Sequence, residues 1–195
     1  MNVNTATPAG AAHLDLPTFR GSHRWPPHVW LLMAMSYSGL FAEWMVPIAS
    51  GLAWFYCGVG GNFEYWPDGP DRPSQREASP LWNVGQISDN EYMWHRVGAI
   101  GRPEDVPAPG VVRSESLLHH AGGAAWEIRD GDEVKLRTDL DQLRISLLWK
   151  AFVFRDASAR TSLAAASASS GPATRSTPAW QKRIVASYPA AFHAD

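Results

Sequence analysis

Three residues of this chain have the side chains and the spacing of a metal site. His13 and Asp15 stand two positions apart, and His95 lies near the middle of the chain. In a β-strand, residues i and i+2 point to the same face, so His13 and Asp15 would present an imidazole and a carboxylate to one ion. Two imidazoles and one carboxylate on one face of the metal are the ligands of non-haem Fe(II) centres. We therefore take His13, Asp15 and His95 as candidate metal ligands.

A cation stands at the start of the apolar segment from Leu143 to Phe154. Arg144 needs a partner there, because burying an unpaired charge is costly, and a guanidinium meets a carboxylate with two parallel hydrogen bonds. A structural ion pair with Asp139 or Asp141 would supply that partner, and so would the carboxylate of a ligand. Ser146 would face the same way on a strand and add a hydroxyl to the same carboxylate.

The elements that must position these residues are mostly strands. One helix is expected from His28 to Phe41, ending near Gly39, and Asp130-Gly131 marks a hairpin turn. A polar loop is expected over 71–80 and a long connection over 101–123. The expected strands are 13–19, 45–56, 62–66, 82–87, 91–97, 126–128, 133–136 and 143–154, the last of them buried and central. Many short strands with Gly and Pro turns predict a mainly β fold of the sandwich or barrel class.

Composition divides the chain into three parts. Residues 1–12 are small and polar and are predicted to be a disordered lead. Residues 13–156 carry the apolar strands and form one β domain. Residues 157–195 begin as a tract of Ala, Ser, Thr and Gly, which predicts a low-complexity tail, with a weak helix over 180–192.

The bulk composition excludes some classes of protein. The chain has 195 residues, 45% of them hydrophobic, and a net charge of -2, so no basic excess points to nucleic acid. The apolar run from Val29 to Gly61 is interrupted by Glu43 and Pro47 into pieces shorter than the roughly 20 residues of a membrane span. The single cysteine, Cys57, excludes an intramolecular disulfide and is expected to be a small core residue of a cytoplasmic protein. The oligomeric state stays open.

The ordered set of motifs resembles the Fe(II)/2-oxoglutarate-dependent oxygenases, in particular the prolyl-hydroxylase-like branch. In that branch the far histidine begins a His-x-Val-like strand, and the co-substrate arginine leads an Arg-x-Ser-Leu-like strand followed by Trp. A strand of Gly-Gly-X-hydrophobic-X-aromatic type lies between the metal motifs. The matching pieces here are His13-Leu14-Asp15, Gly60-Gly61-Asn62-Phe63-Glu64-Tyr65-Trp66-Pro67, His95-Arg96-Val97 and Arg144-Ile145-Ser146-Leu147-Leu148-Trp149.

The resemblance implies a double-stranded β-helix (jelly roll) with one or two flanking helices, and a dioxygenase that hydroxylates a small molecule or a side chain. Fe(II) would be held by His13, Asp15 and His95, and 2-oxoglutarate by Arg144 with Ser146. Arg102 is the second choice for the arginine that binds the co-substrate, because its separation from His95 along the sequence is closer to that usual in the family. The weaker candidates for the walls of the substrate pocket are Trp54, Tyr65, Trp66 and Trp94.

Two other interpretations stay open. Members of the superfamily usually carry further strands and helices before the His-X-Asp strand, whereas twelve residues precede His13 here, so the resemblance is to an N-terminally shortened form. Such a form fits a non-catalytic β-sandwich binding module of the same fold. A cupin-type metalloprotein would instead combine His95 with His119 or His120.

Overall fold

The computed structural model describes residues 1–20 and 28–161, and in them the chain is mainly β, with antiparallel sheets. It divides into two compact units. The first combines Met1–Asp15 with Ile48–Phe152, and the second combines Leu16–Pro47 with the chain from Val153 onward. Most of the expected tail, including the helix over 180–192, lies outside the described residues.

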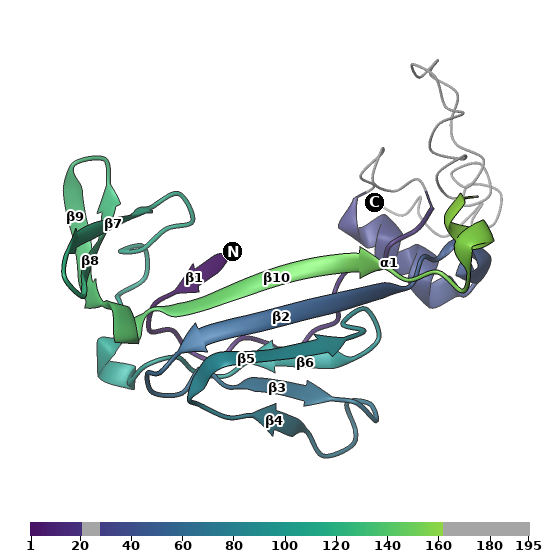
Figure 1. Ribbon diagram of the computed structural model, residues 1–195, viewed down its shortest axis with the longest axis horizontal. Helices are drawn as coiled ribbons and strands as arrows, with labels where there is room; N and C mark the ends of the chain where they lie inside the picture. Colours follow the sequence, from purple (N-terminus) through teal and green to yellow (C-terminus); the bar gives the residue numbers. More distant parts are fainter. Residues whose placement is uncertain (21–27, 162–195) are drawn as a thin grey trace, which may run out of the picture. The chain divides into compact units, whose positions relative to one another are not determined.

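The largest sheet of the first unit has four antiparallel strands in the order β1-β10-β2-β5 (Figure 1). They are β1 (Asn2–Asn4), β2 (Ile48–Tyr56), β5 (Leu81–Ser88) and β10 (Arg144–Phe152). The last three follow the expected strands closely. The expectation of a disordered lead is wrong at β1, which pairs with Arg144–Ser146 through its backbone. Backbone pairing of this kind leaves no apolar pattern in the sequence.

A second sheet has the order β4-β3-β6, from β3 (Phe63–Trp66), β4 (Gln75–Glu77) and β6 (Trp94–Val97). β4 lies in the segment expected to be a polar loop. The N-terminal segment, residues 7–15, runs antiparallel along β6 and the residues that flank it. Its contacts include bridges of Thr7 with Ile100 and of His13 with His95, and a 2.8 Å hydrogen bond from the Asp15 N–H to the Asn90 carbonyl.

Aromatic side chains pack the two sheets against each other. The core cluster joins Trp54 and Tyr56 of β2, Leu81 of β5, Phe63 of β3 and Ile100. The rings of Trp54 and Phe63 lie 5.2 Å apart. Along β2 the buried side chains alternate with less buried ones, so one face of the first sheet, the inner face, is turned toward β3 and β6.

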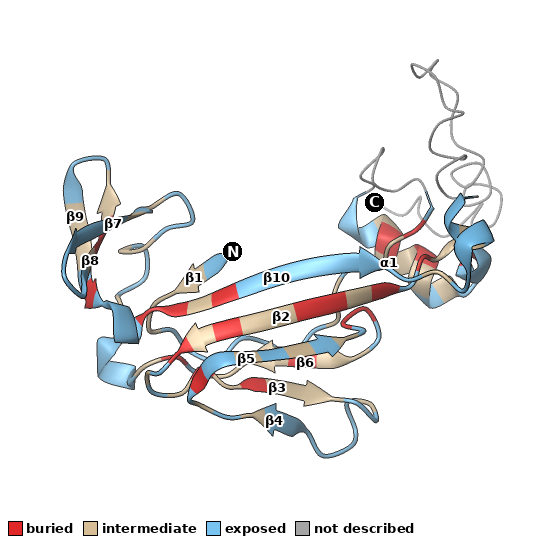
Figure 2. Cartoon of the chain, in the orientation of Figure 1, coloured by how far each residue is buried: buried red, intermediate tan, exposed pale blue. Residues whose placement is uncertain are grey.

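Burial along β10 differs from the prediction of a buried central strand. β1 pairs only with Arg144–Ser146, and among the described residues the remainder of β10 has a strand partner on one side only, β2. Figure 2 shows that buried residues occur only at the start of β10. The apolar side chains of Leu147, Leu148 and Trp149, farther along the strand, are exposed.

A third sheet, β7-β8-β9, completes the first unit. Its strands are β7 (Leu117–Gly122), β8 (Ala125–Asp130) and β9 (Glu133–Asp139), and two short 3-10 helices, η2 (Pro103–Asp105) and η3 (Leu140–Gln142), flank them in the chain. The predicted hairpin is confirmed, with Gly131 at φ 59° in the turn. The expected long connection contains η2 and β7.

The second unit contains α1 (Val29–Ser38) and the 3-10 helix η1 (Ala42–Trp44). The helix ends as predicted at Gly39, whose φ of 66° is a left-handed conformation that glycine adopts without strain. Phe19, Leu32, Met35 and Phe41 form its own buried cluster. Among the described helices, none has both the length and the apolar character needed to cross a membrane.

One expectation about a core residue is wrong. Cys57 follows β2 directly and its side chain is exposed, with a free thiol. The strand β2 ends with Tyr56, before the apolar run does, so Cys57 lies outside the sheet.

The aromatic core predicts a large difference between two tryptophans on neighbouring strands. Trp54 is 1% exposed, whereas Trp82 is 57% exposed. Trp54→Ala should lower the free energy of unfolding by about 3–5 kcal/mol through cavity formation, and Trp82→Ala by about 1 kcal/mol or less. Urea denaturation followed by circular dichroism measures both; equal losses would contradict this packing.

Candidate metal centre

Two distant segments bring the three candidate ligands together. His13 and His95 exchange two backbone hydrogen bonds of 3.0 Å, and their rings lie 4.5 Å apart. Asp15 follows on the same segment, and its Oδ1 lies 3.6 Å from Nε2 of His95. Within the described residues, these three form the group of metal-binding side chains whose ligand atoms all lie within 4.8 Å of one another. The expected trio is thus assembled.

Both imidazoles are held in the same way by their own backbone. Nδ1 of His13 lies 3.0 Å from the carbonyl oxygen of Ala11, and Nδ1 of His95 lies 2.9 Å from that of Met93. A carbonyl oxygen only accepts, so each Nδ1 donates its hydrogen and each neutral ring keeps its lone pair on Nε2. Anchoring one ring nitrogen in this way is the usual second contact of a metal-binding histidine.

Burial keeps His95 in the form that binds a metal. Its side chain is buried, and this burial, with smaller contributions from His13 and Lys150, lowers the pKa of His95 below its usual value, although the Met93 carbonyl and Asp15 oppose the shift. The ring is therefore neutral near pH 7. His13 is exposed and Asp15 half-buried, so the group is accessible from one side.

The residues present fit a divalent transition metal. Two imidazole nitrogens and one carboxylate oxygen are a donor set that such ions prefer, with bonds of about 2.0–2.2 Å. The ion would draw the three atoms together from their present separations. We conclude that the group can hold a metal ion.

One residue of this site, Lys150, is not among those predicted from the sequence. Lys150 on β10 places its Nζ 2.8 Å from Oδ2 of Asp15, so the two carboxylate oxygens face different partners. The signal was the alternation along β10, because Arg144, Ser146 and Lys150 stand at even spacing and share one face. The sequence predicts a shared face for Arg144 and Ser146, and the same alternation places Lys150 on that face.

Arg144 lies in the core, away from the three ligands. Its side chain is 2% exposed; Nε donates a 2.8 Å hydrogen bond to the carbonyl of Gly61, and Nη2 has no hydrogen-bond partner among the described residues. Burial lowers the pKa of Arg144 to about 10, although the nearby Tyr56 opposes the shift. The expected pair with Asp139 or Asp141 is not among the ion pairs of the described residues.

A series of aromatic contacts leads from Arg144 to the candidate ligands. The guanidinium carbon lies 5.9 Å from the ring centre of Trp54, whose ring is 5.2 Å from that of Phe63, which in turn is 5.6 Å from His95. The Gly61 N–H is bonded to Ala99, four residues beyond His95 along an extended segment, or about 13 Å. The structure therefore does not bring Arg144 to the metal ligands. Ser146 is buried on the same face of β10, opposite Trp54.

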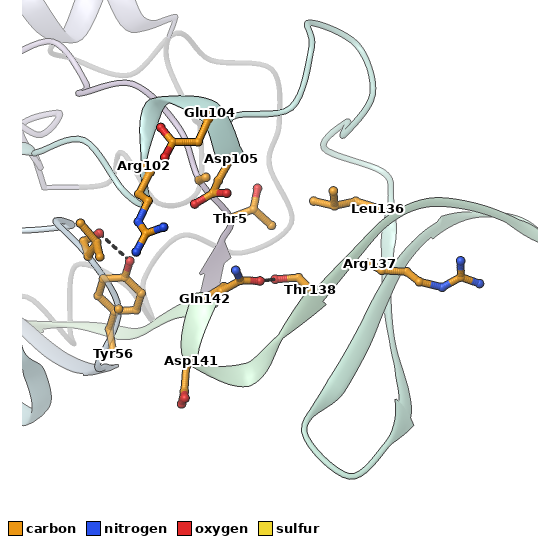
Figure 3. A pocket seen from close by; sticks show the side chains of 14 residues that line it. Thr5, Tyr56, Arg102, Glu104, Asp105, Leu136, Arg137, Thr138, Asp141 and Gln142 are labelled. Carbon is orange, nitrogen blue, oxygen red and sulfur yellow. Dashed lines mark hydrogen bonds between the residues drawn. The ribbon is translucent and has the colours of Figure 1, made fainter.

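Arg102, the second choice, lines a cavity of about 530 Å³ (Figure 3). In Figure 3 its side chain points toward Tyr56, and Glu104 and Asp105 lie close by. The cavity also includes Thr5, near the start of the segment that carries His13. Because Thr7 pairs with Ile100 and His13 pairs with His95, this cavity lies toward the other end of that segment from the three ligands.

The four aromatic residues expected around the pocket fall on two faces. Tyr65 pairs with His95 across the sheet and shares its face, which is a suitable position for a wall of the site. Trp66 pairs with Trp94 on the opposite face, where Arg96 stacks 5.5 Å from the Trp66 ring. Trp94 and His95 face opposite ways, as neighbouring residues of one strand do. Trp54 is a core residue.

The alternative ligands of a cupin-type site are not brought to His95. His119 and His120 lie on β7 and are exposed. His120 places Nε2 2.9 Å from the carbonyl of Gly123 and packs on Trp126. Within the described residues, neither belongs to a group of three metal-binding side chains.

Comparison of the chain with protein-family models, with curated proteins and with solved structures gives no match in any of the three. The geometry of the site is therefore the basis for any functional conclusion.

The isolation of Arg144 predicts that its charge is dispensable. Arg144→Met keeps most of the side-chain volume and removes a buried cation, so the free energy of unfolding should stay equal or rise by about 1–3 kcal/mol. Metal affinity should not change. Chemical denaturation and isothermal titration with Ni(II) measure the two quantities. A variant that stays folded but loses metal binding would show that Arg144 serves the site.

Proposed function

We propose that this chain is an Fe(II)- and 2-oxoglutarate-dependent dioxygenase built on a double-stranded β-helix. The observation that carries the proposal is the pair of imidazoles, each with Nδ1 beside a backbone carbonyl, that offer a ring nitrogen within 4.8 Å of each other and of the Asp15 carboxylate. This donor set leaves coordination positions for a co-substrate and for oxygen. The packed sheets of the first unit and the order of the ligands along the chain support the proposed fold.

The chain's own residues have a limited task in this reaction. Bound Fe(II) would supply the coupled activation of oxygen and 2-oxoglutarate that hydroxylates a C–H bond. His13, Asp15 and His95 would orient the ion, and the side chains of Tyr65 and Phe63 near His95 would keep water from one side of it. We place the protein in the cytoplasm, where a reducing environment keeps Fe(II) and the exposed Cys57 thiol reduced.

Metal binding is the first test. The unmodified chain should bind one Ni(II) or Fe(II) per molecule in anaerobic titration calorimetry. His95→Ala and Asp15→Ala should each weaken binding by at least about 100-fold, because each removes one of three ligands. His119→Ala, which changes an exposed histidine on β7, is the matched control and should bind as the unmodified chain does.

The control also separates the alternatives. Loss of metal in His119→Ala but not in Asp15→Ala would favour the cupin-type ligand set. A chain that binds no metal in any form would favour the non-catalytic binding module and overturn the proposal.

Turnover is the second test. With Fe(II), 2-oxoglutarate and oxygen, the chain should release succinate slowly even without its substrate, at a rate measurable by mass spectrometry. His13→Ala should abolish this release, since His13 is the exposed ligand whose loss leaves the buried core intact. Stoichiometric metal binding without any succinate would contradict the oxygenase assignment while leaving the metal centre in place.

A further inference from the structure

The four-stranded sheet holds the carboxylate of Asp15 through Lys150. Nζ of Lys150 lies 2.8 Å from Oδ2 of Asp15, whereas Oδ1 of the same carboxylate lies 3.6 Å from Nε2 of His95. Lys150 belongs to β10, and Asp15 belongs to the segment that runs along β6, so this contact joins two sheets. One oxygen of the carboxylate is therefore held by a strand of the core, and the other faces the candidate metal centre.

The same sheet also holds the backbone of Asp15. The Asp15 N–H donates a 2.8 Å hydrogen bond to the carbonyl of Asn90, whose side-chain oxygen accepts a 2.6 Å hydrogen bond from the Ser88 hydroxyl. Ser88 of β5 stands opposite Ser50 of β2, and Ser50 stands opposite Lys150 of β10. One cross-strand row thus reaches Asp15 at its carboxylate and, through Asn90, at its backbone.

This arrangement differs from an ordinary ion pair on a protein surface. A surface pair contributes little, because two long and mobile side chains must be held in one geometry. Here the acid is short, its backbone is bonded to Asn90, and its side chain is only 22% exposed. The ammonium of Lys150 therefore meets a carboxylate whose position is already fixed, and it sets the direction in which each oxygen points.

We propose that Lys150 is a positioning residue that reserves one oxygen of Asp15, so that this ligand offers a bound metal ion a single oxygen. A carboxylate can bind a cation through one oxygen or through both. An ammonium that donates to Oδ2 leaves Oδ1 for the ion, and one more coordination position of the ion stays open. This inference rests on the metal centre of the proposed function and concerns how that centre is kept accessible.

The ammonium of Lys150 has two opposing effects on metal affinity. Removing a hydrogen bond that orients a metal-binding carboxylate typically weakens metal binding by about 10- to 100-fold. An ammonium close to a divalent cation also repels it, so removing the charge strengthens binding. We therefore expect Lys150→Met to bind metal within about tenfold of the unmodified chain. The number of open coordination positions, in contrast, reports the role of Lys150 directly.

The test counts the water molecules on Mn(II) bound to the full chain, from the relaxation rate of the water protons. In the unmodified chain, His13, Asp15 and His95 should leave about three positions of an octahedral ion to water. Lys150→Met should lower the count by about one, because the freed Oδ2 also binds the ion. Lys150→Arg keeps a cationic donor and should restore the count. Lys135→Met, the matched control, removes the lysine of an ion pair on β9 and should leave the count unchanged.

The outcomes separate this inference from the proposed function. Circular dichroism and Mn(II) titration of each variant are read first, and Lys150→Leu replaces Lys150→Met if the latter does not fold. An equal water count with and without the lysine would overturn the role of Lys150 and leave the metal centre in place. A lower count that Lys150→Arg does not reverse would overturn it as well. If the unmodified chain binds no metal, the proposed function and this inference both fail.

Discussion

The backbone pairing of the N-terminal segment with β6 is the interaction on which the site depends. His13 and His95 are bonded to each other through both backbone groups, and Asp15 is bonded to Asn90. These bonds fix the distance between two ligands on one segment and a third on another. Just before this segment the chain forms β1, which pairs with β10, so residues 2–15 join two different sheets. A short length of chain thus links the core to the candidate metal centre.

Two cationic side chains on β10 have different surroundings, although they look alike in the sequence. Arg144 and Lys150 share one face of the strand, six residues apart. Arg144 is enclosed by the aromatic core, where the Gly61 carbonyl accepts its hydrogen bond, whereas Lys150 remains reachable and meets Asp15. The position along the strand, more than the type of cation, decides which side chain can serve a ligand.

Much of this arrangement follows from local sequence patterns. The alternation of Met93, His95 and Val97 with Trp94 and Arg96 gives the correct faces of β6, and Asp130-Gly131 gives the hairpin. The exposure of Leu147 and Trp149 does not follow, because an apolar run looks the same whether its strand has one neighbour or two. β1 and β4 are too short and polar to be recognised. The contact of Lys150 with Asp15 depends on the packing of two sheets, which no local pattern encodes.

The pairing of the N-terminal residues with β10 and β6 also has a consequence for how the protein folds during synthesis. β1 and its partner β10 lie at the two ends of the first unit in the chain, so β1 leaves the ribosome well before β10. To form contacts between such distant positions, the chain must first close a long loop, which costs conformational entropy. β1 must therefore wait, unpaired, until β10 has been made. The metal centre is completed only when β6 has joined its sheet, so a truncated chain that ends before β6 would carry His13 and Asp15 without the site.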